Sequence, residues 1–166
     1  MKNGSWSVLV AVLLVAFAGM ARAQETHNAG QNAAEMKFVN FPGLPTCMKG
    51  AFMDGDPSKG PSIVLAKGTA GCTVPWHWHT PTERVMIVIG TVRMEMKDGK
   101  AVTLHAGGFS LVSPHHPHQA HCATACTMFV YGDAAFDIHY VDKEGNEISP
   151  DDALKAVKEK TIKPAS

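Results

Sequence analysis

The sequence has no excess of charge of either sign, no hydrophobic run long enough to cross a bilayer and none of the common phosphate-binding motifs. Its 166 residues hold 15 Lys and Arg against 15 Asp and Glu, and no basic patch with interleaved aromatic residues indicates a nucleic-acid partner. There is no glycine-rich phosphate loop and no Gly-x-Ser-x-Gly nucleophile elbow. Nucleic acid is therefore not expected as a partner, and any catalytic chemistry has to come from other residues.

The longest apolar run is Val8 to Ala18, which is short of the roughly 20 residues that span a bilayer. Lys2 precedes it, and Ala21-Arg22-Ala23 follows as a small-residue cleavage site. This pattern predicts a signal peptide over residues 1–23 and favours it over an uncleaved anchor. We expect a periplasmic or secreted protein with no membrane association after cleavage. A lipid anchor is not expected, because there is no cysteine near the cleavage site.

Only four cysteines are present, and all lie beyond the predicted cleavage site. An even number of cysteines in an oxidising compartment favours disulfides. Cys122 and Cys126 are close enough in sequence to bridge across a turn, which would leave Cys47 to pair with Cys72. Three pairings are conceivable, and four buried thiols are an equally open alternative.

Short apolar runs, each ended by turn residues, predict an antiparallel all-β domain over residues 36–166, preceded by a flexible arm over 24–35. Val92, Met94 and Met96 alternate with charged residues, as in a half-buried strand, and Asp98-Gly99 is a hairpin signal. The predicted strands cover residues 62–66, 84–89, 91–97, 101–104, 109–113 and 127–131.

The end of the chain has the pattern of a short surface helix. Ser149 is a favourable N-cap residue and Pro150 suits the first helical position. Asp151 and Asp152 complement the positive end of the helix dipole. The fold class predicted from these patterns is a small barrel or sandwich with a C-terminal helix.

Histidine is abundant, and seven of the nine fall between His77 and His121. His77 and His79 are two apart, so on a strand both imidazoles point the same way. The intervening Thr80-Pro81-Thr82 gives the chain room to turn, so that Glu83 returns a carboxylate toward the same point. Two imidazoles and a carboxylate form a facial ligand set for one divalent transition metal, with Fe, Cu, Mn, Ni and Zn all open as its identity.

The spacing of Gly71, His77, His79, Glu83 and Gly90 is similar at every fixed position to the first motif of the cupin superfamily, G-x5-H-x-H-x3-E-x6-G. The second motif, G-x5-P-x-G-x2-H-x3-N, is matched in part, by Gly107 and His118. The chain has Ser113 where that motif has Pro, His115 where it has Gly, and Cys122 where it has Asn.

The resemblance implies a single cupin double-stranded β-helix, or jelly-roll, barrel of six to eight strands, with the metal held by His77, His79, Glu83 and His118 at its mouth. It also implies a closed, apolar pocket. The residues expected to line that pocket are Val85, Ile87, Val92, Met94, Phe109 and Leu111.

Other side chains compete for these roles. His116 shares a strand face with His118 and is the alternative third histidine, whereas His121 would reach the metal only through a bulge. Surface or hydrogen-bonded roles are favoured for His105, His115 and His121. A zinc or copper set of His121, Cys122 and Cys126 is a further alternative, although export argues against free thiols.

The resemblance to cupins of the quercetin dioxygenase type implies an exported metal-dependent oxygenase or oxidoreductase acting on a small phenolic, enol or diketone substrate. Glu83 would then be both a metal ligand and the general base. The alternatives are a non-catalytic module that binds a small ligand or sugar, a metal-dependent isomerase, and a copper-dependent enzyme acting oxidatively on carbohydrate. The resemblance also implies a homodimer.

Overall fold

The computed structural model describes residues 30–162. The predicted signal peptide and residues 24–29 of the predicted arm lie outside this range, so both remain predictions. Among the described residues, no helix is both long and apolar enough to cross a membrane.

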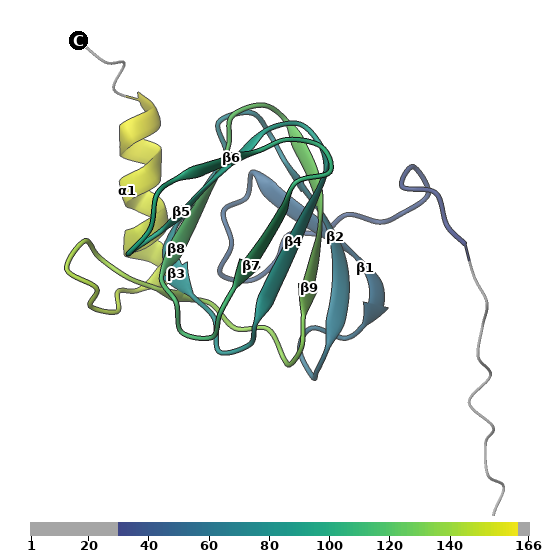
Figure 1. Ribbon diagram of the computed structural model, residues 1–166, viewed down its shortest axis with the longest axis horizontal. Coiled ribbons are helices and arrows are strands. Elements are labelled where there is room, and N and C mark those ends of the chain that lie inside the picture. The colour runs from purple at the N-terminus through teal and green to yellow at the C-terminus, as the bar shows by residue number, and fades with distance from the viewer. Residues whose placement is uncertain (1–29, 163–166) are drawn as a thin grey trace, which may run out of the picture. The chain divides into compact units, whose positions relative to one another are not determined.

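Two five-stranded antiparallel sheets build the domain (Figure 1). The first sheet has the order β1-β2-β9-β4-β7 and the second β10-β3-β8-β5-β6. The strands of the first sheet are β1 (Met48–Gly55), β2 (Ser62–Gly68), β4 (Glu83–Ile89), β7 (Phe109–Val112) and β9 (Cys126–Gly132). Those of the second are β3 (Thr73–Trp78), β5 (Val92–Met96), β6 (Val102–Leu104), β8 (His118–Cys122) and β10 (His139–Tyr140). The predicted all-β class is confirmed.

The alternation of side chains along each strand explains how the sheets bury a common core. Val64, Val130 and Val85 lie side by side on β2, β9 and β4 in the strand register, and they point into the space between the sheets. Met94 of β5 and Val74 of β3 are buried in the same core from the second sheet. Burying these apolar side chains is the main stabilising contribution to a domain of this size.

Glycine-containing turns connect the strands where the sequence predicts them. β5 and β6 pair as an antiparallel hairpin around Asp98-Gly99. Gly90 ends β4 with φ of +87°, and a Cβ added there would overlap the backbone oxygen of Ala125. Position 90 therefore requires glycine both for its backbone conformation and for the close approach of the β8–β9 turn.

Two of the residues predicted to line the pocket face outward instead. Phe109 and Leu111 are 54% and 53% exposed, and they lie on the outer face of the first sheet. The strand register explains the error, because Phe109 is opposite Met86, which also faces outward, whereas Ser110 is opposite the buried Val85. A four-residue strand read without its partner does not reveal which of its two faces is inside.

The C-terminal helix is confirmed as α1 (Pro150–Ile162; Figure 1). It contacts β3 and β10. The backbone N–H of Asp152 donates to the Ser149 hydroxyl at 3.2 Å, as expected of an N-cap. Ala153 is 3% exposed and joins the hydrophobic core.

The structure resolves the cysteine pairing that the sequence leaves open. Cys47 pairs with Cys72, and Cys122 pairs with Cys126. Since both sulfurs of the second pair are oxidised, the alternative metal set of His121, Cys122 and Cys126 is wrong.

Candidate metal centre

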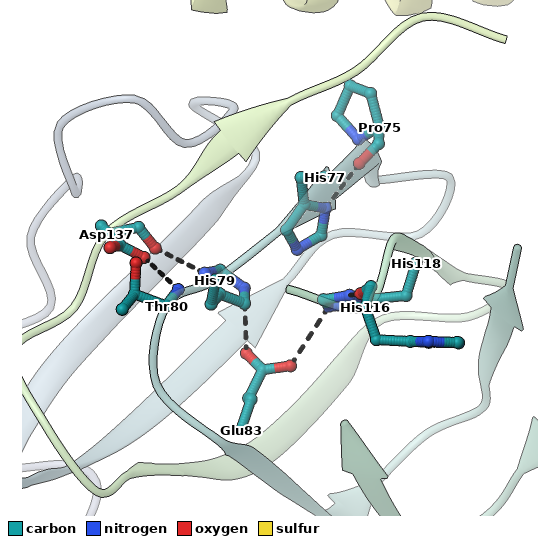
Figure 2. A network of polar contacts seen from close by, with 8 residues as sticks. All are labelled: Pro75, His77, His79, Thr80, Glu83, His116, His118 and Asp137. Carbon is teal, nitrogen blue, oxygen red and sulfur yellow. Dashed lines mark hydrogen bonds and ion pairs between the residues drawn. The ribbon is translucent and has the colours of Figure 1, made fainter. Parts of the chain in front are cut away.

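Four predicted site residues meet between the two sheets (Figure 2). His77 on β3 is the register partner of His118 on β8 in the second sheet, and His79 follows two residues after His77. Glu83 opens β4 in the first sheet. All three histidines are buried, and one ring nitrogen from each lies within 4.8 Å of those of the other two.

Backbone carbonyls fix the orientation of every imidazole. The Nδ1 atom of His77 contacts the Pro75 carbonyl at 2.6 Å, that of His79 the Asp137 carbonyl at 2.5 Å, and that of His118 the His116 carbonyl at 3.0 Å. Because a carbonyl oxygen can only accept, each Nδ1 carries the proton. Nε2 is therefore the nitrogen of each ring that is left to bind a metal. This arrangement is typical of histidines that bind a metal.

The Glu83 carboxylate faces the Nε2 atoms of two of the histidines. Oε2 of Glu83 lies 3.4 Å from Nε2 of His118, and Oε1 lies 3.7 Å from Nε2 of His79 (Figure 2). Nε2 of His79 is buried and has no hydrogen-bond partner among the described residues. An unsatisfied buried polar atom is unfavourable. A divalent cation would accept all four electron pairs, so the donor set fits a transition metal.

The electrostatics of His77, His79 and Glu83 agree with this fit. Burial lowers the pKa of His77 well below its usual value, and burial likewise lowers the pKa of His79. Both rings are therefore neutral near pH 7 and able to bind a metal. Burial alone would raise the pKa of Glu83, but the contacts with His118 and His79 hold it below its usual value. Glu83 is consequently ionised, as a ligand carboxylate must be.

An apolar cavity of about 110 Å³ adjoins these side chains. Val85 and Met94 line it, as predicted, whereas Ile87 and Val92 belong to the core and are not part of the cavity wall. Phe41 and Phe136, which the sequence does not single out, also line it. The site thus combines a polar metal-binding end with an apolar chamber, an arrangement typical of small-molecule sites.

The comparison with protein families assigns this part of the chain. The family model described as Cupin domain matches residues 64–131, a span that includes His77, His79, Glu83 and His118. This part of the chain is therefore similar to a cupin domain.

Solved structures share the cupin fold with this chain. A cupin of the RmlC-like type from Ralstonia eutropha JMP134 is 23% identical, covering 84% of this chain and 93% of that one, with a TM-score of 0.55. A similar cupin from Shewanella frigidimarina is 19% identical, covering 63% and 88%, with a TM-score of 0.54. The DMSP lyase DddQ from Ruegeria pomeroyi is 16% identical, covering 68% and 64%, with a TM-score of 0.57. No curated protein matches the sequence significantly.

The second cupin motif is matched only in part, but its histidine, His118, lies at the site. His118 occupies the predicted place, and His115, at the motif's glycine position, has φ of +56°. It is the only non-glycine residue with positive φ in the described part of the chain. The backbone conformation is therefore kept without the glycine, at some conformational cost.

The competing histidines lie elsewhere. His116 contributes its carbonyl to His118, while its ring is directed away from Glu83 (Figure 2). Nδ1 of His121 contacts the Thr73 hydroxyl at 2.8 Å, and Nδ1 of His105 contacts the Thr91 hydroxyl at 3.2 Å. His115 is exposed beside Trp78. The surface or hydrogen-bonded roles expected for His105, His115 and His121 are confirmed.

The sequence does not predict which backbone carbonyls contact the imidazoles. Asp137 orients His79 through its carbonyl, and its carboxylate accepts the backbone N–H of Thr80 at 2.7 Å. One residue of the β9–β10 loop therefore holds both His79 and the turn that leads to Glu83. A backbone carbonyl leaves no trace in residue type, so only the fold reveals this role.

Proposed function

We propose that this cupin is a metal-dependent oxygenase or oxidoreductase acting on a small organic substrate of the phenolic, enol or diketone kind. The observation that carries the proposal is the convergence of three histidine side chains and one carboxylate beside an apolar cavity. His77, His79, His118 and Glu83 would hold one divalent metal, with Fe, Cu, Mn, Ni and Zn as candidates. When bound, a redox-active ion would supply the oxidation chemistry.

Glu83 is the group best placed to move a proton. Its carboxylate is ionised and lines the cavity, while its two oxygens face His79 and His118. It would accept the hydroxyl proton of a phenol or enol bound in the chamber, as a general base. The apolar walls would orient the substrate and exclude water from the reacting oxygen.

Oxygen consumption tests the proposal directly. Protein reconstituted separately with Fe, Cu, Mn or Ni would be incubated with phenols, diketones and flavonols. We expect at least one metal form to consume oxygen in step with substrate loss. Metal binding without consumption across the panel would favour the non-catalytic binding module instead.

A second candidate is turnover without oxygen, as in an isomerase or lyase. One structure that shares the fold is named as a DMSP lyase, so this scaffold also carries non-oxidative chemistry. Substrate loss under anaerobic conditions at an unchanged rate would select this candidate over the oxygenase.

We also propose that the protein acts in the periplasm or outside the cell. The two disulfides support this location, because such bonds persist in oxidising compartments. Mass spectrometry of the exported protein would test it. We expect an N-terminus after Ala23 and no free thiols, whereas a chain retained with four free thiols would contradict the proposal.

A homodimer is proposed through the outer face of the first sheet. Met86 and Phe109 are cross-strand neighbours there, and with Leu111 they leave three large apolar side chains exposed. A second copy of the chain would cover them. Light scattering should show a dimer that Phe109→Glu converts to a monomer, and a monomeric wild type would contradict this assignment.

A further inference from the structure

Two of the proposed metal ligands, His79 and Glu83, are joined by a short connector, residues 80–82. The connector carries the chain from the second sheet, where His79 follows β3, to the first, where Glu83 opens β4. The proline at its centre has no backbone N–H, so only Thr80 and Thr82 offer one. Both N–H groups are bound by carboxylates from a distant segment of the chain, so the conformation of the connector depends on that segment.

The carboxylates belong to the loop between β9 and β10, residues 133–138, which we call the crossing loop. It starts beside one end of the connector, because Gly132 of β9 is the register partner of Glu83. It ends beside the other, because His139 of β10 is the register partner of Trp78. The crossing loop and the connector therefore pass between the two sheets side by side.

Three contacts tie the connector to the crossing loop. The Thr80 N–H donates to the Asp137 carboxylate at 2.7 Å. The carbonyl oxygen of Asp137 accepts from Nδ1 of His79 at 2.5 Å (Figure 2). The Thr82 N–H donates to the Asp133 carboxylate at 3.0 Å. The connector is therefore held at both ends, next to each of its two ligands.

The crossing loop has its own attachment to the rest of the domain. The backbone N–H of Phe136 donates to the Pro57 carbonyl at 2.7 Å. The Phe136 ring makes an edge-to-face contact with Phe41, at 6.4 Å between centroids, and it lies 5.2 Å from the ring of His79. Neither Pro57 nor Phe41 belongs to β3 or β4, so the loop has contacts that do not depend on the connector.

The geometry of the ligand set depends on the connector. His77 and His118 are cross-strand partners in the second sheet, so strand pairing already positions them. Glu83 comes from the other sheet, and its oxygens lie 3.4 Å from Nε2 of His118 and 3.7 Å from Nε2 of His79. A binding site needs its side chains held within about 0.5 Å of the productive geometry. The connector is the shortest covalent link between the two halves of the set, so its conformation decides whether they stay that close.

We propose, on the basis of the metal-dependent function above, that Asp137 and Asp133 are positioning residues for the metal site. By accepting the two N–H groups of the connector, they hold His79 and Glu83 at the separation that one divalent ion requires. Asp137 has the larger effect, because it contacts both the connector and the His79 ring, whereas Asp133 contacts the connector and Arg84. Neither carboxylate binds the ion itself.

Metal binding by the intact chain tests the proposal without relying on turnover. Zinc affinity is measured by competition with a chelating dye, and the visible absorption of the cobalt(II)-loaded protein reports the arrangement of the ligands. We expect Asp137→Ala to lower the zinc affinity by about tenfold or more, as is typical when a residue that orients a metal ligand is lost, and to change the cobalt spectrum. Asp133→Ala should change both in the same direction and by less.

The conservative variant separates hydrogen bonding from charge. The side-chain oxygen of asparagine can still accept the Thr80 N–H, so Asp137→Asn should keep the zinc affinity within about threefold of the wild type and should keep the wild-type cobalt spectrum. A loss in Asp137→Asn as large as in Asp137→Ala would mean that the negative charge attracts the ion, and it would overturn the positioning role. Wild-type affinity and spectrum in Asp137→Ala would overturn it too.

The matched control is Asp142→Ala. Asp142 also accepts backbone N–H groups, those of Gly145 and Asn146, both at 2.8 Å, but in the turn of residues 142–146 rather than in the crossing loop. It should leave affinity and spectrum unchanged, and a loss equal to that of Asp137→Ala would overturn the proposal, since the effect would then be one of general stability. If Asp137→Ala does not fold, the exposed Asp133 carries the test, and wild-type binding in Asp133→Ala would overturn the proposal.

Failure of the metal site can be distinguished from failure of the positioning role. If the wild type binds neither zinc nor cobalt, the metal-dependent function fails, and amide hydrogen exchange of the metal-free protein, followed by NMR, still tests the hold on the connector. We expect Asp137→Ala to speed exchange at Thr80 by about fivefold or more while leaving Gly145 unchanged, and Asp142→Ala to do the reverse. Equal exchange at Thr80 in the wild type and Asp137→Ala would show that the carboxylate does not hold the connector.

Discussion

His77 of β3 and His118 of β8 are direct register partners on adjacent antiparallel strands, with ring centroids 4.1 Å apart. Cross-strand partners of this kind are the closest side chains on a sheet face. The strand pairing alone therefore brings His118 to the site, although the sequence around it departs from the second cupin motif at three positions. His79 and Glu83 then complete the set from the turn that connects the two sheets.

Removing His118 should abolish metal binding selectively. His118→Ala takes away one of three converging nitrogens, and we expect a loss of affinity greater than about 100-fold, since even residues that only orient a ligand contribute 10- to 100-fold. The control is His121→Ala on the same strand, which loses only the contact with Thr73. Competition with a chelating dye would measure both affinities. A comparable loss in the two variants would contradict the assignment.

Glu83 should matter more for turnover than for metal retention. Glu83→Gln keeps the size of the side chain but removes the base, so oxygen consumption should fall by about 100-fold or more, in the range typical of general-base removal. The three histidines should still hold the metal in both Glu83→Gln and Glu83→Ala. Metal content and rate, measured on the same samples, check this prediction. Equal turnover in Glu83→Ala and wild type would exclude Glu83 as the base.

The metal-free protein should lose stability as the pH falls below about 6.5. Burial lowers the pKa of His77 and His79 in the folded protein, whereas in the unfolded chain both titrate near 6.5. Protons therefore bind the unfolded chain first, and each histidine should lower the free energy of unfolding by up to about 1.4 kcal/mol per pH unit, until its folded pKa is reached. Above pH 6.5 this effect should vanish.

Urea unfolding of the chelator-treated protein at several pH values measures that slope. His77→Gln should show a shallower slope, because one of the two buried groups no longer titrates. His105→Gln, which changes an exposed histidine, should keep the wild-type slope. A slope that is the same in all three proteins would mean that the buried histidines are not its source.

The two disulfides should contribute unequally to stability. The Cys47–Cys72 bond spans 25 residues and Cys122–Cys126 only 4. Loop-closure entropy gives about 3.5 kcal/mol for the first and about 1.9 kcal/mol for the second. Denaturation of the paired Cys→Ser variants would compare them. A greater loss from removing the shorter link would show that residues 39–47 are held by contacts other than the Cys47–Cys72 bond, such as the hydrogen bonds of Val39 with Gly50.

Much of the fold could be predicted from the sequence, because most strands carry their own signals. Three features depend on neighbouring residues alone: the alternation in β5, the hairpin at Asp98-Gly99 and the N-cap at Ser149. The inward or outward orientation of Phe109 depends instead on which strand pairs with β7, and that information is absent from the four residues themselves. β1 (Met48–Gly55) contains two glycines and no regular polar alternation, so it was missed.

The site was predictable where chemistry lies in side chains at fixed spacing. His77, His79 and Glu83 lie on the end of one strand, the turn after it and the start of the next strand, so their convergence follows from local geometry. The carbonyl of Asp137 and the ring of Phe41 reach the site from 58 and 38 residues away from His79 along the chain. Tertiary contacts of that kind are visible only in the folded molecule.

The central claim is that three imidazoles and the Glu83 carboxylate bind one cation. X-ray absorption of the protein reconstituted with one equivalent of zinc tests it most directly, with the His118→Ala variant measured beside it. We predict one tightly bound ion per chain with three imidazole nitrogens at about 2.0–2.1 Å and at least one oxygen, and loss of this signature in the variant. A protein that binds no zinc, or one whose zinc environment is the same in His118→Ala, would contradict the account.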